Sequence, residues 1–525
     1  MKASDIFARA LENEGVEYIF GIPGEENIDL VDSISRSHIK FILTRHEQGA
    51  AFMADTYGRL TGKPGVCLST LGPGATNLVT GISNAHLDKV PVVAITGQAS
   101  RDRLHKESHQ NIDTLKLFSG ITKYNVSAMV PEAIPEIIRK AFSTAVSEQP
   151  GAAHIQLPED VASAEIEEIP NLIIPEKTVY EAVGKQIEEA AKIINSSNNP
   201  IILAGNGIIR SRAWDALSVL VDRSNIPIVS TFMAKGVVPF NHPRNLFVVG
   251  GKPYPPGMRP LHSADLVIAA GFDLVEYDPI TWNNDSSRKI INIHTSPAET
   301  DEHFPVEIDL VGEISVTLTR LAGFLKRRTD TSVHDEIRRR RLENITSRSD
   351  VRFSLVKGVF AALTEILPED STVISDVGIH KVWFSRWYHP SQPNKTIVYN
   401  GFASMGGSIP AAIAAKLVRP SDIIVSVSGD GGFLMNVQEL ETAKRLHLGF
   451  ISIVLNNGTY GLIKQKQEDA GMKPEFISFS NPDFELLARS FGASYVKVDD
   501  EGSFREALRN SLNTTDVRII EIPSP

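Results

Sequence analysis

The sequence predicts an α/β protein made of three doubly wound domains, each a parallel sheet covered by helices. Three observations lead to this prediction. Short apolar runs rich in β-branched residues alternate with helical patterns throughout the 525 residues. Two polar stretches interrupt the alternation and divide the chain into parts of similar size. A chain of this length is also too long to fold around a single hydrophobic core.

The expected strands are short and almost entirely apolar, which is typical of strands buried on both faces. The first residues, MKASDIFARALENEG, predict an amphipathic helix that Gly15 is placed to end. Examples of the expected strands lie at 40–44, 90–96, 201–203, 266–271, 422–428 and 450–455.

Two stretches have the composition of linkers. Residues 165–180 are acidic and contain proline, and residues 326–350 are charged and poor in strand formers. They leave domains near 1–164, 180–325 and 350–525. The basic run at 338–341 lies within the second linker, where we expect a solvated helix rather than a binding patch.

Composition excludes several classes of protein. The net charge of −10 argues against a sequence-independent grip on nucleic acid. A single cysteine, Cys67, excludes an intramolecular disulfide and suits a reducing compartment. No stretch approaches the roughly 20 apolar residues of a membrane span. We therefore expect a cytoplasmic protein that binds neither nucleic acid nor membrane.

The strongest chemical signal lies at 422–460, where a strand runs into the turn Gly429-Asp430-Gly431-Gly432. A helix and a second strand follow, and the second strand ends at Asn457. A right-handed crossover would bring Asp430 and Asn457 together at the carboxyl edge of one sheet. Their oxygens suit Mg²⁺, and the glycines let backbone N–H groups approach a diphosphate. Asn436 and Glu439 have the spacing of a capping box at the start of the helix.

This pair of motifs resembles the cofactor signature of thiamine-diphosphate enzymes. By that resemblance, Asp430, Asn457 and the backbone carbonyl of Thr459 would hold magnesium, and the magnesium would hold the diphosphate. The same resemblance places further residues around the cofactor. Met405 would support its bent form, the carbonyl of Ala403 would face its amino group, and Gly378 and His380 would lie near the diphosphate together with Gly429, Gly431 and Gly432.

The aminopyrimidine ring of such a cofactor needs a carboxyl group. In TRHEQGAAFMADTYGR, Glu47 stands where the family has its glutamate, which would share a proton with the ring nitrogen N1′. The alternative interpretation of Glu47 is a carboxylate that stabilises the first turn of a helix. The loop from Gly72 to Asn77 follows a strand and, in the family, lines the site from the first domain.

Across nearly its whole length the chain resembles the acetolactate synthase branch of the thiamine-diphosphate decarboxylase superfamily. RHEQGAAFMAD, LGPGATNLVTGI, VSVSGDGGFLMNVQELETA and VLNNGTYG all match in order and spacing. The resemblance implies the condensation of two pyruvates to acetolactate with loss of CO₂. Pyruvate decarboxylases typically carry two adjacent histidines, whereas here His109 is followed by Gln110, which favours carboligation and makes both candidate catalytic residues beside Glu47.

The resemblance also bears on cofactors and partners. GFDLVEYDPITWNND, at 271–285, is similar to the FAD-free, catabolic type of synthase, so FAD is not expected. Lys235, in MAKGVVP, is instead similar to the biosynthetic type. In this branch the first domain of one subunit faces the third domain of another, which implies a homodimer or homotetramer with sites at the subunit interface.

Three alternatives stay open at this point. The chain could be a 2-ketoacid decarboxylase, or it could resemble a flavin-dependent pyruvate oxidase. From another class, it could be a catalytically silent subunit that binds the cofactor and serves in assembly. The identity of the second ketoacid is also open.

Overall fold

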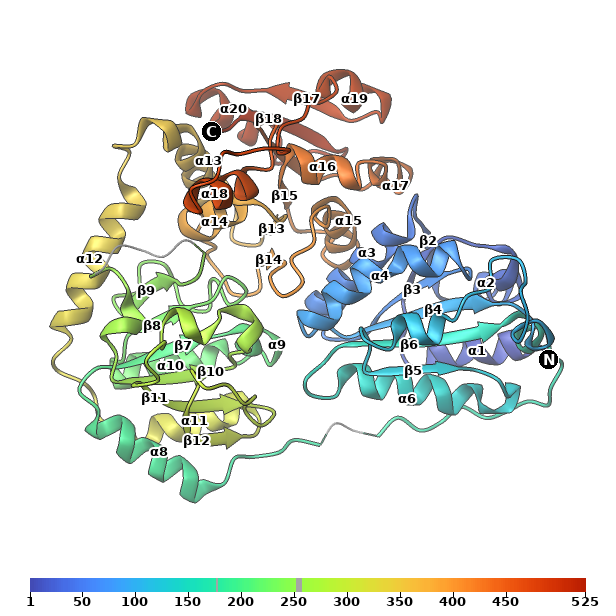
Figure 1. Cartoon of the computed structure of the whole chain (residues 1–525), viewed down its shortest axis with the longest axis horizontal. Coiled ribbons are helices and arrows are strands. Elements are labelled where there is room, and N and C mark those ends of the chain that lie inside the picture. The colour runs from blue at the N-terminus through green and yellow to red at the C-terminus, as the bar shows by residue number, and fades with distance from the viewer. Residues whose placement is uncertain (176–177, 252–256) are drawn as a thin grey trace.

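The computed structural model describes residues 1–175, 178–251 and 257–525. Positions 176–177 of the first predicted linker therefore lie outside the described residues. Within the described residues, the chain forms three parallel sheets of six strands each, with helices on their faces (Figure 1). The predicted fold class is confirmed. We call the parts built on these sheets the first, second and third domains.

The first domain has the strand order β2-β1-β3-β4-β6-β5. The six expected strands named above were all found, two of them here, as β2 and β4. The strands are β1 (Tyr18–Gly21), β2 (Lys40–Leu43), β3 (Gly65–Ser69), β4 (Val92–Gln98), β5 (Tyr124–Ser127) and β6 (Ala152–Pro158). The helices are α1 (Ala3–Asn13), α2 (Ile28–Ser35), α3 (Glu47–Thr61), α4 (Pro73–Leu87), α5 (Thr114–Phe118), α6 (Ile134–Val146) and α7 (Glu159–Ala162).

The second domain has the order β12-β11-β10-β7-β8-β9, which is the order of the Rossmann fold. Its strands are β7 (Pro200–Ala204), β8 (Ile228–Ser230), β9 (Asn245–Val248), β10 (Leu266–Ala270), β11 (Lys289–His294) and β12 (Val306–Val311). Its helices are α8 (Gly184–Ser196), α9 (Asn206–Arg210), α10 (Trp214–Ser224) and α11 (Ile314–Phe324).

The third domain repeats the topology of the first, in the order β14-β13-β15-β16-β18-β17. Its strands are β13 (Thr372–Ser375), β14 (Thr396–Val398), β15 (Ile424–Gly429), β16 (Ile451–Asn456), β17 (Ser494–Lys497) and β18 (Arg518–Pro523). Its helices are α13 (Ser354–Ile366), α14 (Ile379–Trp387), α15 (Ser408–Val418), α16 (Asp430–Met435), α17 (Glu439–Arg445), α18 (Gly461–Asp469), α19 (Phe484–Ser490) and α20 (Glu501–Arg509).

The first and third domains share one hydrophobic core. Helix α3 packs against α15, and the rings of Phe52 and Tyr399 lie 5.6 Å apart between the two domains. Burial of apolar side chains on both sides of this contact stabilises the arrangement of the two domains within one chain.

The basic run at 338–341 behaves differently from the expectation. It lies on α12 (Ser332–Thr346), which runs along the outside from the second domain to the third (Figure 1). Arg339 and Arg340 are exposed and pair with glutamates of their own helix. Arg341 is fully buried and donates to the carbonyl oxygen of Val248 at 2.6 Å. The expectation of a solvated run was wrong for Arg341, because one face of α12 packs on β9.

Among the described helices, none is both long and apolar enough to span a bilayer.

Candidate active site

The predicted cofactor residues of the third domain gather at the carboxyl edge of its sheet. The chain leaves β13 at Gly378 and enters α14, leaves β15 at Gly429 and enters α16, and leaves β16 just before Asn457. β13 and β15 are neighbours, and strand order reverses between them. Such a reversal opens the crevice in which open α/β sheets bind ligands.

Asp430 is the centre of this cluster and is 2% exposed. Its Oδ2 accepts hydrogen bonds from the backbone N–H groups of Gly458 at 2.6 Å and Asn457 at 3.3 Å. Its Oδ1 accepts one from Gly431 at 2.9 Å. The side-chain oxygen of Asn457 accepts from the N–H of Thr459 at 3.1 Å, so hydrogen bonds connect the three predicted metal ligands.

The residues present fit a hard divalent cation. One carboxylate, one amide oxygen and nearby backbone carbonyls are oxygen ligands of the kind that Mg²⁺ takes, with phosphates and water completing its shell. Among the described residues there is no group of three or more His, Cys, Asp or Glu side chains that could hold a metal, and the candidate ligands here include only one carboxylate. The hydroxyl of Thr459 is buried and has no hydrogen-bond partner among the described residues.

Asn481 is a site residue that sequence reasoning missed. Its Nδ2 donates to Asp430 Oδ2 at 2.8 Å and to Asn456 Oδ1 at 3.0 Å. Asn456 in turn donates to Glu521 Oε1 at 2.8 Å. Asn481 lies 51 positions after Asp430, in a loop whose composition gave no signal.

The N-terminus of α14 lies beside that of α16. A Cβ at Gly378 would lie 2.7 Å from the ring of His380, and one at Gly429 would lie 3.4 Å from the same ring. His380 is 4% exposed, and its Nε2 has no partner among the described residues. Burial lowers the pKa of His380 to about 4, which leaves a neutral ring with a free polar atom at the crevice.

The turn after Asp430 is equally tight. A Cβ at Gly431 would lie 3.0 Å from Tyr460, and one at Gly432 would lie 2.6 Å from Asp376 Oδ2. The backbone of this turn is therefore in close contact with its surroundings, and its N–H groups lie at a helix N-terminus, where anions bind. These features fit a diphosphate.

The segment with Ala403 and Met405 follows β14. Ala403 adopts φ +55°, in the left-handed region that non-glycine residues rarely adopt. Met405 is half-buried and packs against the core shared by the first and third domains. The next residue, Gly406, donates its N–H to both carboxylate oxygens of Asp376 at 3.0 Å. Asp376 is fully buried, and burial raises its pKa to about 6. Sequence reasoning missed it too.

The predicted residues of the first domain gather at a different edge. Glu47 begins α3, and its Oε2 accepts from Asn77 Nδ2 at 2.9 Å. A Cβ at Gly72 (φ +46°) would lie 2.5 Å from the carbonyl oxygen of Gln110. His109 and Gln110 are exposed, and their side chains form no hydrogen bond with the described residues.

The structure thus forms two groups of predicted residues. Within the described part of the chain, no hydrogen bond or ion pair joins Glu47 to Asp430, Asn457 or Thr459. Lys235 belongs to neither group, because it is buried between the second and third domains, where its Nζ donates to the carbonyl oxygen of Ser385 at 2.7 Å.

The capping-box expectation for Asn436 and Glu439 was wrong. Helix α16 begins directly at Asp430 and ends at Met435, and Glu439 is the first residue of a separate helix, α17. Asn436 donates to the carbonyl oxygen of Gly406 at 2.8 Å, and Glu439 contacts the first domain. Tertiary contacts override the local spacing here.

Comparison with known proteins agrees with this geometry. Sequence models of thiamine pyrophosphate enzymes match the chain in three places: the N-terminal TPP binding domain at residues 1–117, the central domain at 187–321 and the C-terminal TPP binding domain at 376–522. The chain therefore belongs to the thiamine pyrophosphate (thiamine diphosphate) enzyme family.

Within that family the chain is similar to acetolactate synthases. It is 34% identical to the probable acetolactate synthase large subunit of Methanococcus aeolicus, over 99% of this chain and 92% of that protein. It is 33% identical to the acetolactate synthase of Bacillus subtilis strain 168, over 99% and 93%. It is 32% identical to the catabolic acetolactate synthase of Raoultella terrigena, over 99% and 94%.

Proposed function

We propose that the protein is an acetolactate synthase that uses thiamine diphosphate and Mg²⁺ to condense two pyruvates with loss of CO₂. The observation that carries the proposal is the hydrogen-bonded group of Asp430, Asn457 and Thr459, which lies beside two helix N-termini. The similarity to acetolactate synthases over nearly the whole chain selects this reaction among those of the family.

In this proposal the third domain holds the diphosphate half of the cofactor. Asp430, Asn457 and the carbonyl of Thr459 bind Mg²⁺, which binds the diphosphate. The backbone at Gly378, Gly429, Gly431 and Gly432 and the ring of His380 complete the diphosphate site. Once bound, the cofactor supplies a carbon nucleophile and a sink for the electrons that decarboxylation releases.

The first domain provides the acid–base group. Glu47 holds a proton at the ring nitrogen N1′, and Asn77 orients Glu47 through the hydrogen bond to Oε2. Because Gly72 has no side chain, its loop can pack against the backbone of Gln110 at the edge of the site. Ala403 would offer its carbonyl oxygen to the amino group of the ring, and the flexible apolar side chain of Met405 would support the bound cofactor.

His109 and Gln110 are proposed to face the substrate. Both are exposed at the edge that also holds Glu47, so an incoming 2-ketoacid can reach them. A single imidazole beside an amide offers fewer proton donors than two adjacent histidines. This arrangement favours reaction with a second ketoacid over release of an aldehyde.

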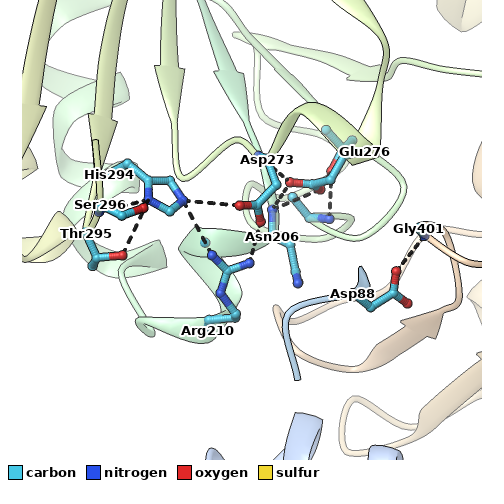
Figure 2. Close-up of polar contacts among 12 residues, drawn as sticks. Asp88, Asn206, Arg210, Asp273, Glu276, His294, Thr295, Ser296 and Gly401 are labelled. Carbon is cyan, nitrogen blue, oxygen red and sulfur yellow. Dashed lines mark hydrogen bonds and ion pairs between the residues drawn. The ribbon is translucent and has the colours of Figure 1, made fainter. Parts of the chain in front are cut away.

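We further propose that the enzyme works without FAD, and a buried polar cluster in the second domain supports this (Figure 2). The backbone N–H of Asn206, at the start of α9, donates to both carboxyl oxygens of Glu276 at 2.9 and 3.0 Å. Arg210 donates to Asp273 at 2.5 Å, and His294 Nε2 lies 3.5 Å from the same carboxylate. These side chains occupy the crevice between β7 and β10, where strand order reverses and a dinucleotide would bind.

The charged groups of this cluster interact mainly with one another and with the backbone of the second domain. Burial works against ionisation of Asp273, but Arg210 and then His294 hold its pKa well below the usual range. Burial, and then the charge of Asp273, raise the pKa of Glu276 to about 8. The diphosphate of FAD would have to displace Glu276 from the N–H of Asn206. This competition supports the proposal that the enzyme works without FAD.

The working unit is proposed to be a homodimer or homotetramer in the cytoplasm. Glu47 of one chain would then serve the cofactor held by Asp430 of the other, which accounts for the two separate groups in one chain. We also propose that the chain is divided into domains at 1–164, 180–325 and 350–525. The proposed substrates of the enzyme are small 2-ketoacids.

The deciding experiment is incubation of the purified protein with pyruvate, thiamine diphosphate and Mg²⁺, with the product identified by NMR. Acetolactate, or the acetoin that it decays to, is the expected product. Acetaldehyde alone would make the protein a decarboxylase. Flavin absorbance in the purified protein would overturn the FAD-free part, and bound cofactor without turnover of any 2-ketoacid would favour a silent subunit.

A further inference from the structure

Asp88 joins the first domain to the loop that carries Ala403 and Met405. It caps the C-terminus of α4 and is 1% exposed. Its Oδ1 accepts the N–H of Gly401 at 2.5 Å, and its Oδ2 accepts the N–H of Asn400 at 3.3 Å. The same Oδ2 accepts from Arg59 Nη2 at 2.5 Å. Figure 2 shows Asp88 pointing at Gly401 beside the polar cluster of the second domain.

The loop held by Asp88 is fixed from two further sides. Asn400 Nδ2 donates to the carbonyl oxygen of Glu276 at 3.0 Å, which connects the loop to the second domain. Lys381 Nζ donates to Asn400 Oδ1 at 3.2 Å and to the carbonyl oxygen of Tyr399 at 3.1 Å. Three domains thus meet on two consecutive residues of one loop.

The loop needs this support because it contains a strained residue. Ala403 has φ +55°, a conformation that persists for a residue with a Cβ only where the surroundings enforce it. Gly401 has no such strain, but its closeness to Asp88 leaves no room for a side chain. A Cβ there would lie 2.7 Å from Asp88 Oδ1 and 3.0 Å from the carbonyl oxygen of Leu87.

We propose that Asp88 is a positioning residue that holds the Ala403–Met405 segment in the shape that binds the cofactor. The inference rests on the proposed function, since that function assigns the segment to the cofactor. Helix α4 gives the contact a further consequence. Asn77, in its first half, binds Glu47, and Asp88 caps its other end, so one helix links the Glu47 group to the Met405 loop.

A simpler role for Asp88 would be to neutralise the buried Arg59, and Asp55 provides the control for it. The side chains of Asp55 and Asp88 are both fully buried, and both form an ion pair with Arg59 at 2.5 Å. Asp55 forms no hydrogen bond with the 400–401 loop. A variant of Asp55 therefore weakens the same buried ion-pair cluster without releasing the loop.

The test compares Asp88→Asn, Asp55→Asn and Gly401→Ala with the wild type. The dissociation constant of thiamine diphosphate, measured by calorimetry at saturating Mg²⁺, reports binding without turnover. The exchange of the thiazolium C2 proton with deuterium, followed by NMR at saturating cofactor, reports its bound geometry. We expect Asp88→Asn and Gly401→Ala to weaken binding and slow exchange by about tenfold to 100-fold, the range that misplacement of reacting groups produces.

Asp55→Asn should keep the dissociation constant of thiamine diphosphate and the C2 exchange rate within about twofold of the wild type. It should lower the melting temperature as Asp88→Asn does. The double variant Asp88→Asn/Gly401→Ala should be no worse than the more affected single variant, because both changes break one contact. If Asp88→Asn does not fold, Gly401→Ala carries the test, since it keeps both of the carboxylates that pair with Arg59.

Two results would overturn the inference. One is a Gly401→Ala or Asp88→Asn protein that binds the cofactor and exchanges the C2 proton as the wild type does. The other is an Asp55→Asn protein with the same losses as Asp88→Asn, which would leave only the ion-pair role. A wild type that fails to bind thiamine diphosphate would instead overturn the proposed function and this inference with it.

Discussion

Glu439, the first residue of α17, accepts the backbone N–H of His46 through its Oε1 at 3.0 Å. The same oxygen accepts the N–H of Arg45 at 3.0 Å, and Oε2 accepts the hydroxyl of Thr442 at 2.6 Å. The third domain therefore fixes the two residues that precede Glu47 on the first domain. Glu439 is fully buried, and burial raises the pKa of its carboxyl group.

Replacing Glu439 with alanine should destabilise the contact between the first and third domains. Two part-buried N–H groups would lose their acceptor, and the cost is about 1–3 kcal/mol for each one that stays shielded from water. We expect a lower melting temperature and weaker thiamine diphosphate binding, measured by thermal unfolding and calorimetry. The control is Glu441→Ala on the same helix, whose side chain pairs with Arg445 at 37% and 35% exposure and should cost little. Equal effects of the two variants would contradict the assigned role.

Replacing Asn481 with alanine should weaken metal binding more than folding. Asn481 donates to the carboxyl oxygen of Asp430, and loss of a partner behind a metal ligand typically costs about tenfold to 100-fold in affinity. The measurement is a Mg²⁺ titration at fixed thiamine diphosphate, followed by protein fluorescence. Asn513→Ala, in an exposed loop at the opposite edge of the sheet, is the matched control. An unchanged Mg²⁺ affinity would show that the backbone donors alone hold Asp430.

Lys235 should make stability depend on pH. Burial lowers its pKa to about 7 from the usual 10.5, so between these values the unfolded chain binds more protons and stability rises with pH. Below about pH 7 the buried ammonium group is charged, and the free-energy cost of burying it no longer changes with pH. Relative to the wild type, Lys235→Met should therefore gain most at about pH 6, and the gain should shrink by up to about 1.4 kcal/mol per unit towards about pH 9.

Melting temperatures of both proteins at the two pH values measure this difference. The exposed Lys192→Met is the control, and its difference from the wild type should be the same at both pH values. If the difference in melting temperature between Lys235→Met and the wild type is also the same at both pH values, the amine of Lys235 stays charged throughout this range.

The positions of the strands could be predicted because parallel strands buried on both faces have a simple pattern. The apolar run at 422–428 corresponds to β15 (Ile424–Gly429) and the run at 450–455 to β16 (Ile451–Asn456). The short β14 (Thr396–Val398) gives no such signal, since three residues carry no periodicity. Arg341 was misjudged because a charged run hides which of its members faces a neighbouring strand.

The geometry of the candidate site was predictable where its residues belong to one βαβ unit. Asp430 and Asn457 sit at the ends of adjacent strands, so their meeting follows from a right-handed crossover. Asn481, Asp376 and Asp88 form hydrogen bonds between distant segments, and each looks in sequence like an ordinary loop or cap residue. Contacts of this kind depend on how the domains pack, which no local pattern records.

Replacing Gln110 with histidine should shift the product from acetolactate towards acetaldehyde. The variant creates adjacent histidines at 109 and 110, which adds a proton donor beside the reacting carbon. Gln110 has φ +54°, a region in which histidine is tolerated better than most residues. NMR of the products gives the ratio directly, with Gln110→Asn as the control that keeps an amide. An unchanged ratio would place residue 110 away from the substrate.

Mixing two inactive variants tests whether a site is shared between chains. Glu47→Gln and Asp430→Ala should each abolish turnover alone. In a mixed dimer one site would combine an intact Glu47 with an intact Asp430 of the partner chain, so activity should return. Random pairing makes half of the dimers mixed, with one intact site of two, which gives about one quarter of wild-type activity.

The matched control for this mixture is Glu47→Gln coexpressed with Asn77→Ala. Both changes lie on the same side of the site, where Asn77 donates to Glu47 at 2.9 Å, so each site of a mixed dimer carries one of the defects. This mixture should not exceed the activity of its parents. If the Glu47→Gln and Asp430→Ala mixture also stays inactive, Glu47 and Asp430 of a single chain serve the same cofactor, and the proposed interface is wrong.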